Sequence, residues 1–221
     1  MSRAVLLDAL GTLLELQPPA PRLRRLLAAA GHEVSEERAA AGFGAEIGYY
    51  VEHHLEGADR DSLHDLRDRC ATVMLEALEL PGLDHATARR AMLGALEFTA
   101  YPDVSPALAA LRSGGWQLVV VSNWDCSLPE WLAGCGLLDR VDDVVTSAAT
   151  GAAKPDPAIF RRALELAGAD PAEAVHVGDS LDKDIEGARA VGIRAIFIAR
   201  EGRPPAGIEA VESLERMPSL V

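Results

Sequence analysis

Short apolar runs alternate with helical patterns along most of this 221-residue chain. The runs have the length and apolar character of buried strands, and they fall near residues 3–8, 116–121, 143–146, 174–178 and 194–198. Strands that alternate with helices pack as a parallel sheet that has helices on both faces. We therefore predict an α/β fold with a doubly wound, Rossmann-like parallel sheet.

Residues 15–98 interrupt this alternation. The interval has no convincing strand, and its apolar spacing predicts helices near residues 23–30, 36–55, 62–80 and 85–98. A chain of this length can hold a large core together with a smaller domain. We expect an all-α domain at 15–98, inserted into a sheet domain made of residues 1–14 and 99–221.

Charge and composition exclude several classes of protein. The net charge of −13 argues against a nucleic-acid partner, because nucleic-acid binding needs basic patches. No apolar run approaches the roughly 18 residues of a membrane span, and the chain enters its first strand at once, which leaves no room for a signal peptide. We expect a cytoplasmic protein without membrane contact, and the sequence sets no oligomeric state.

The first apolar run leads directly into Asp8-Ala9-Leu10-Gly11-Thr12-Leu13. A side chain at the carboxyl end of a buried parallel strand faces the crevice where open α/β sheets bind ligands. Gly11 allows the chain to turn sharply beside such a ligand. Asp8 is therefore a candidate for chemistry at this edge of the sheet.

Two further fragments carry groups that suit an anionic ligand. Ser122 and Asn123 follow the second apolar run, and they offer a hydroxyl and an amide without adding negative charge. Lys154 precedes a helix start at Pro155 or Pro157, where a lysine can reach an oxyanion near the helix terminus.

A fourth fragment gathers carboxylates after the run at 174–178. Asp179 follows that strand directly, and Asp182 and Asp184 lie just beyond it, an oxygen-rich arrangement that suits Mg²⁺. His176 lies inside the strand, and we expect it to be a satisfied sheet residue that faces a helix and has no catalytic role.

In this order and at these separations, the four fragments resemble those of the haloacid dehalogenase superfamily. The resemblance covers nearly the whole chain, and most members of the superfamily are Mg²⁺-dependent phosphatases that work through an aspartyl-phosphate. It implies that the helical insertion is a mobile cap that closes over the active site and selects the substrate. The expected substrate is a small phosphorylated metabolite, a phosphate ester or an acyl phosphate.

The resemblance also implies a role for each matching residue. Asp8 is the nucleophile, and the ligands of Mg²⁺ are its carboxylate, the backbone carbonyl of Leu10 and the carboxylate of Asp179. Asp184 supports the metal indirectly or through Lys154.

The remaining matches concern the transferred phosphoryl group. Ser122 and the backbone of Asn123 are expected to hydrogen-bond this group, while Lys154 neutralises its oxygens and orients Asp8.

Leu10 departs from the pattern of the phosphatases, most of which carry a second aspartate there. That aspartate protonates the leaving oxygen and then activates water, and leucine does neither. General acid–base catalysis contributes about 10²- to 10⁴-fold, so its loss slows alkyl phosphate hydrolysis and affects acyl or aryl phosphates less. Asp125 is the nearest replacement in the sequence.

The same departure leaves two alternatives open. The first is a 2-haloacid dehalogenase, because a halide leaves without a proton and the first motif is similar to that of these enzymes, which usually carry tyrosine at the position of Leu10. Against it, Asp179 would repel the carboxylate of a haloacid. The arginines near the start of the insertion, Arg22, Arg24 and Arg25, are expected to form an ordinary charged helix face. The second alternative is an impaired member that binds Mg²⁺ and an anion or a protein partner without turnover.

Overall fold

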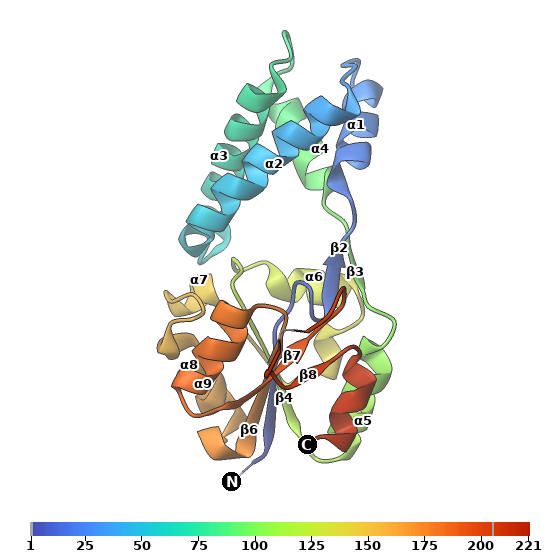
Figure 1. Ribbon diagram of the computed structural model, residues 1–221. Coiled ribbons are helices and arrows are strands. Elements are labelled where there is room, and N and C mark those ends of the chain that lie inside the picture. Colours follow the sequence, from blue (N-terminus) through green and yellow to red (C-terminus); the bar gives the residue numbers. More distant parts are fainter. Residues whose placement is uncertain (1, 205) are drawn as a thin grey trace. The chain divides into compact units, whose positions relative to one another are not determined.

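The computed structural model describes residues 2–204 and 206–221. The chain divides into two compact units (Figure 1). Met1–Glu15 and Thr99–Val221 form the first, which we call the sheet unit, and Leu16–Phe98 form the second, which we call the helical unit.

In the described part of the chain, the sheet unit is built on six strands in the order β5-β4-β1-β6-β7-β8, and every neighbouring pair is parallel. The strands are β1 (Ala4–Leu7), β4 (Gln117–Ser122), β5 (Asp143–Thr146), β6 (Ala174–Gly178), β7 (Arg194–Ile198) and β8 (Ala210–Val211). This sheet confirms the predicted α/β fold. The sequence did not indicate β8, because a two-residue strand is too short to show a period.

Helices cover both faces of this sheet. Figure 1 shows α8 (Pro157–Ala167) and α9 (Gly187–Ala190) on one side and α5 (Val104–Ser113) on the other. The unit also contains α6 (Leu128–Gly134), α7 (Ser147–Thr150), the π-helical turn η4 (Leu181–Glu186) and the short 3₁₀ segments η2 (Leu138–Arg140), η3 (Pro171–Glu173) and η5 (Leu214–Ser219).

Helix α8 illustrates how local sequence sets an element. Its first residue is Pro157, and the Asp156 side chain accepts a hydrogen bond from the Ala158 N–H at 2.8 Å. Gly168 ends the helix in the left-handed region, with φ of 61°. The buried face of α8, which includes Ile159 and Phe160, packs on the sheet and forms an apolar layer with it.

The register of the parallel strands places their carboxyl ends at one edge. Leu7 is aligned with Val120 of β4 and with Val177 of β6. The residues that follow β1, β4 and β6 therefore meet at this edge, where parallel sheets bind their ligands.

Helices make up most of the second unit. They are α1 (Pro19–Ala29), α2 (Glu36–His53), the 3₁₀ turn η1 (His54–Glu56), α3 (Arg60–Leu78) and α4 (His85–Ala95). The predicted continuation of the last helix to residue 98 is wrong, because Leu96 is extended and ends α4. Ser35, Asp59 and Asp84 cap three of the helices by accepting a backbone N–H three residues ahead.

The chain passes between the two units through two short strands. β2 (Leu14–Leu16) and β3 (Phe98–Ala100) pair in a two-stranded sheet, and the Gln17 N–H donates to the Glu97 carbonyl at 2.8 Å. Three-residue strands give no clear alternation, which is why the sequence did not indicate them.

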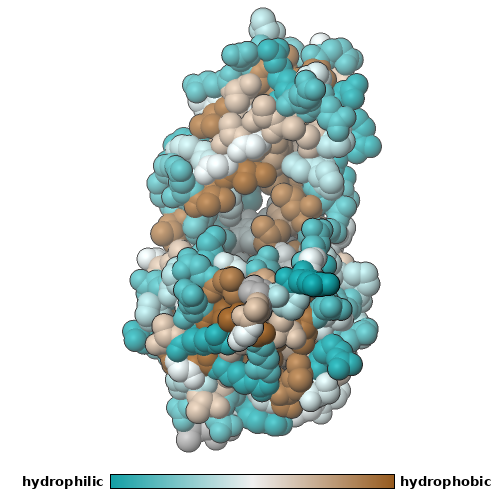
Figure 2. Space-filling view, in the orientation of Figure 1, coloured by the Kyte–Doolittle hydropathy of each residue, from teal (hydrophilic) through white to brown (hydrophobic). Residues whose placement is uncertain are grey.

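Apolar patches interrupt an otherwise hydrophilic surface (Figure 2). Exposed Ile47 and Val51 share one face of α2, and exposed Leu55 follows four residues later in the turn η1. Within residues 2–204 and 206–221, no helix has the length and apolar character needed to cross a membrane.

Candidate active site

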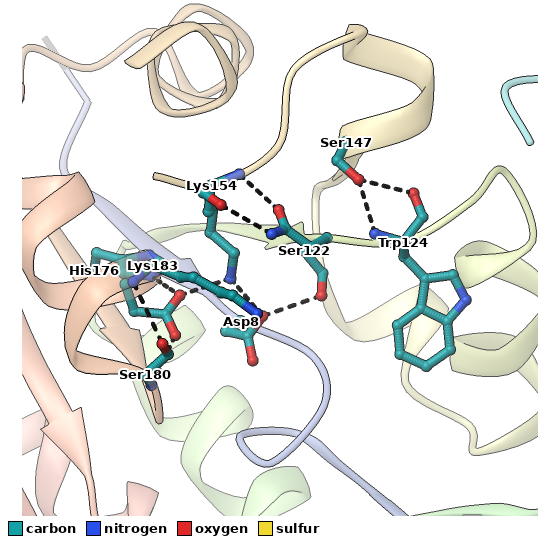
Figure 3. Close-up of polar contacts among 10 residues, drawn as sticks. Asp8, Ser122, Trp124, Ser147, Lys154, His176, Ser180 and Lys183 are labelled. Atoms are coloured by element: carbon teal, nitrogen blue, oxygen red, sulfur yellow. Dashed lines mark hydrogen bonds and ion pairs between the residues drawn. The ribbon is translucent and has the colours of Figure 1, made fainter. Parts of the chain in front are cut away.

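Polar side chains converge at the carboxyl edge of the sheet (Figure 3). Asp8 follows β1, Ser122 ends β4, and Lys154 lies in the loop between α7 and α8. Asp179 follows β6, and Asp184 lies in η4. All five were predicted from the sequence as site residues, and the fold brings them into one cluster.

The Asp8 carboxylate is buried and held on one oxygen. Its Oδ1 accepts a hydrogen bond from Lys154 Nζ at 2.5 Å and another from Ser122 Oγ at 3.0 Å. Its backbone N–H donates to the Val177 carbonyl at 2.9 Å, which fixes the main chain against β6. Among the described residues the side-chain contacts of Asp8 fall on Oδ1, so Oδ2 is the oxygen left for chemistry.

Lys154 bridges two carboxylates. Its Nζ also donates to Asp184 Oδ1 at 2.6 Å, and the ammonium group is almost fully buried. Asp184 Oδ2 accepts the Ser180 N–H at 3.0 Å, while Oδ1 lies 2.9 Å from His176 Nε2. Asp184 is therefore held from three directions.

Asn123 fixes the backbone of Lys154. Its side-chain Oδ1 accepts the Lys154 N–H at 2.7 Å, and its Nδ2 donates to the Lys154 carbonyl at 3.0 Å. The sequence had pointed to the Asn123 backbone as a contact for the substrate. The structure adds that the Asn123 amide positions the lysine that holds Asp8.

Three carboxylates gather tightly enough to share one cation. One ligand oxygen each from Asp8, Asp179 and Asp184 can be chosen so that all lie within 4.8 Å of one another. Gly11, with φ of 79°, brings the loop after β1 against Asp179, and a Cβ at this position would lie 2.1 Å from Asp179 Oδ2. Asp182, also noted in the sequence, is exposed and is not among the three.

The electrostatics of the cluster follow from this crowding. Burial, together with the charge of Asp184, raises the pKa of Asp8 despite the nearby Lys154. Desolvation of its carboxyl and the charges of Asp8 and Asp184 raise the pKa of Asp179 to about 6, although part of the residue is exposed. The ion pair with Lys154 and the hydrogen bond with His176 outweigh burial and hold the pKa of Asp184 well below its usual range.

Lys154 itself stays charged, because the two carboxylates raise its pKa in spite of its burial. Three carboxylates against one ammonium group leave an excess of negative charge. A divalent cation bound to the carboxylates would offset this excess.

Leu10 and Asp125 are the two residues that bear on the missing general acid. Leu10 is 44% exposed, and it forms an isolated bridge with Leu14. Asp125 is buried, and its Oδ1 accepts the Ser127 N–H at 2.7 Å, which closes a local turn. This hydrogen bond of Asp125 serves the local backbone.

His176 contacts the cluster, which the sequence did not indicate. It faces α8, as expected, and its ring meets Phe160 edge-on at 5.2 Å, but it also contacts Asp184. The signal in the sequence was a lone polar residue inside an apolar strand.

Comparison with known proteins places this geometry in a family. Residues 2–192 match the family model of the haloacid dehalogenase-like hydrolases. A bovine (Bos taurus) protein named haloacid dehalogenase-like hydrolase domain-containing protein 3 is 45% identical over 114 residues, or 51% of this chain. That match spans only 45% of the bovine protein's own length.

Two other proteins match over almost their full lengths. A plasmid-borne phosphoglycolate phosphatase of Cupriavidus necator is 34% identical over 99% of this chain and 92% of its own. The solved structure of L-2-haloacid dehalogenase from Xanthobacter autotrophicus has a TM-score of 0.71 at 25% identity, covering 100% of this chain and 98% of that one. The strand order, the carboxylate cluster and these matches agree, and the chain belongs to the haloacid dehalogenase-like hydrolase family.

Proposed function

We propose that this hydrolase is a Mg²⁺-dependent phosphatase that acts on a small phosphorylated metabolite through an aspartyl-phosphate on Asp8. The observation that carries the proposal is the cluster of three carboxylates, two of which pair with a single buried lysine. A phosphate group would be repelled by this cluster unless a cation were bound.

The donor set suits Mg²⁺, which prefers carboxylate and carbonyl oxygens. Asp8 and Asp179 would supply carboxylate oxygens, the Leu10 backbone a carbonyl oxygen, and Asp184 indirect support through Lys154. The glycine at position 11 is consistent with this, because it lets the loop that carries Leu10 approach Asp179 closely. When bound, the metal would offset the repulsion between Asp8 and the substrate phosphate.

The residues of the chain account for the covalent step. Asp8 Oδ2 attacks phosphorus, the bond from phosphorus to the leaving oxygen breaks, and an aspartyl-phosphate forms. Lys154 and Ser122 hold Oδ1 and keep the carboxylate aimed. Attack by water on the phosphorus then releases phosphate and restores Asp8.

Leu10 narrows the substrate class. An alkyl phosphate releases a strongly basic alkoxide that needs a proton, and leucine has none to give. An acyl phosphate releases a carboxylate, which leaves without protonation. We therefore infer that acyl or aryl phosphates are turned over faster than alkyl phosphates.

The helical unit is proposed to act as a cap that selects the substrate. It is inserted between β1 and β4, through the paired strands β2 and β3. The phosphatase activity named for the Cupriavidus necator relative supports a small phosphorylated substrate.

The proposal is tested by measuring phosphate release from acetyl phosphate and p-nitrophenyl phosphate, with and without Mg²⁺. Release that requires both Mg²⁺ and Asp8 is expected, and Asp8→Asn serves as the control. If release by the wild type does not exceed that of Asp8→Asn, the phosphatase mechanism is refuted.

A 2-haloacid dehalogenase is the second candidate, because Leu10 stands where a phosphatase carries its proton donor, and a departing halide needs no proton. Against it, Asp179 adds a negative charge beside Asp8, and Arg22 is ion-paired with Glu97. Halide release from 2-chloropropionate in the absence of Mg²⁺ would favour this candidate. Binding of Mg²⁺ without turnover of either substrate class would instead favour an impaired member.

A further inference from the structure

His176 is a polar residue in the middle of an apolar layer. Its strand neighbours in register are Leu6 of β1 and Ala195 of β7, and both belong to the buried layer between the sheet and α8. The imidazole is fully buried, and its Nδ1 has no hydrogen-bond partner among the described residues. An aliphatic side chain would fill this position without burying an unpartnered polar atom.

The polar contact that the structure gives the ring is the one with Asp184. Nε2 lies 2.9 Å from Asp184 Oδ1, the oxygen that also accepts from Lys154 Nζ. The Asp184 carboxylate is ionised and can only accept, so Nε2 carries the proton and donates. The ring is thus held through Nε2 alone among the described residues, since Nδ1 has no hydrogen-bond partner there.

We propose that His176 is a positioning residue, which acts through Asp184 and Lys154 to hold the nucleophile Asp8 in place. The inference rests on the proposed function of Asp8. Phe160 fixes the ring by its edge-on contact, the ring fixes Asp184 Oδ1, and that oxygen fixes Lys154 Nζ 2.5 Å from Asp8 Oδ1. A residue that breaks the apolar pattern without a gain in packing is expected to serve the site rather than the core.

The test replaces the ring by leucine or by glutamine. His176→Leu removes the donor while it retains an apolar filling, and His176→Gln places an amide N–H near the position of Nε2. Loss of a group that orients a site residue typically costs about 10- to 100-fold. For His176→Leu we expect a fall in kcat of this size with KM changed less than about twofold, whereas His176→Gln recovers most of the activity.

A purely structural role would give a different pattern. Leu164→Val alters packing in the same apolar layer without touching the hydrogen bonds, and we expect it to leave kcat within about twofold of the wild type. Unchanged kcat in His176→Leu, or equal losses in the leucine and glutamine variants, would overturn the proposal. So would an equal loss in Leu164→Val.

A second measurement does not depend on activity or on the folding of the leucine variant. Long-range ¹H–¹⁵N spectra of the wild type report which ring nitrogen carries the proton, with His176→Gln used to assign the signal. A protonated Nε2 is expected, and a bare Nε2 would overturn the proposal. If the wild type releases no phosphate, the proposed function fails. The His176 proposal is then tested by the protonated ring nitrogen and by the Mg²⁺ affinities of the wild type and the two variants, measured by titration. Weaker binding in the leucine variant that glutamine restores would support it, and equal binding in all three would overturn it.

Discussion

Glu46 is a buried carboxyl group in the helical unit, and its raised pKa is expected to lower the stability of that unit progressively between about pH 4.5 and pH 7. Its side chain lies on α2 and the residue is 6% exposed. Burial raises the pKa of Glu46 from 4.5 to about 7, although a hydrogen bond with the Cys70 thiol opposes part of the shift. In the unfolded chain the group ionises near pH 4.5.

The size and sign of the effect follow from this difference of about 2.5 pKa units. Well below pH 4.5 the Glu46 carboxyl is protonated in both the folded and the unfolded chain, so its ionisation does not change the free energy of unfolding. As the pH rises toward 7, the unfolded state ionises first, and stability is lost progressively. Above pH 7 the loss levels off at about 3 kcal/mol, since each unit is worth about 1.4 kcal/mol.

The measurement compares the wild type with Glu46→Gln, which is neutral at every pH and nearly isosteric. Between pH 5 and pH 8, the stability advantage of the glutamine variant is expected to grow by about 2.5 kcal/mol. Urea unfolding followed by far-UV circular dichroism reports the helices. Tryptophan fluorescence reports the sheet unit separately, because Trp116, Trp124 and Trp131 all lie outside residues 16–98.

The matched control is Glu52→Gln, an exposed carboxyl on the same helix. Its advantage over the wild type is expected to change by less than about 0.5 kcal/mol across this range. If the difference in unfolding free energy between Glu46→Gln and the wild type is equally independent of pH, burial does not govern the ionisation of Glu46 and the reasoning is refuted.

Three further predictions concern the site. Leu10→Asp is expected to raise turnover of alkyl phosphates by up to about 10²-fold and that of acetyl phosphate much less; equal or absent gains would mean that another group already supplies the proton. Asp179→Asn is expected to weaken Mg²⁺ binding, measured by calorimetry, by at least about tenfold, whereas the exposed neighbour change Asp182→Asn leaves it unchanged; the reverse order would remove Asp179 from the metal site. Gly11→Ala places a Cβ against Asp179 at positive φ, so it is expected to cost about 1–3 kcal/mol of stability in urea unfolding and to weaken Mg²⁺ binding, and wild-type values for both would contradict the close approach.

Most of the fold could be predicted because the strands of a buried parallel sheet are continuous apolar runs. The run that begins at Ala4 and the run that ends at Val121 are unambiguous on this ground, and parallel pairing then brings Asp8 and Ser122 to one edge. Strands that are too short to show a hydrophobic pattern, and that are defined by their pairing with another strand, could not be predicted. β2, β3 and β8 have two or three residues each and carry no period.

The site could be predicted as a set of residues but not as a network of contacts. Asp8, Lys154 and Asp184 follow from the motifs, whereas the bridging of the two carboxylates by one ammonium group required the fold. The second role of Asn123, on the Lys154 backbone, and the contact of His176 with Asp184 depend on side-chain directions that spacing along the sequence does not encode.

The hydrogen bond between Gln17 and Glu97 closes the inserted segment at its own base. Because the two ends of the insertion already lie side by side, the sheet unit needs no long span to reconnect them, and a tight turn could replace everything between. The helical unit is thus an exchangeable module. In the cap role that we propose for it, shortening or exchanging this module would alter which substrate the hydrolase accepts without rebuilding the sheet that carries Asp8.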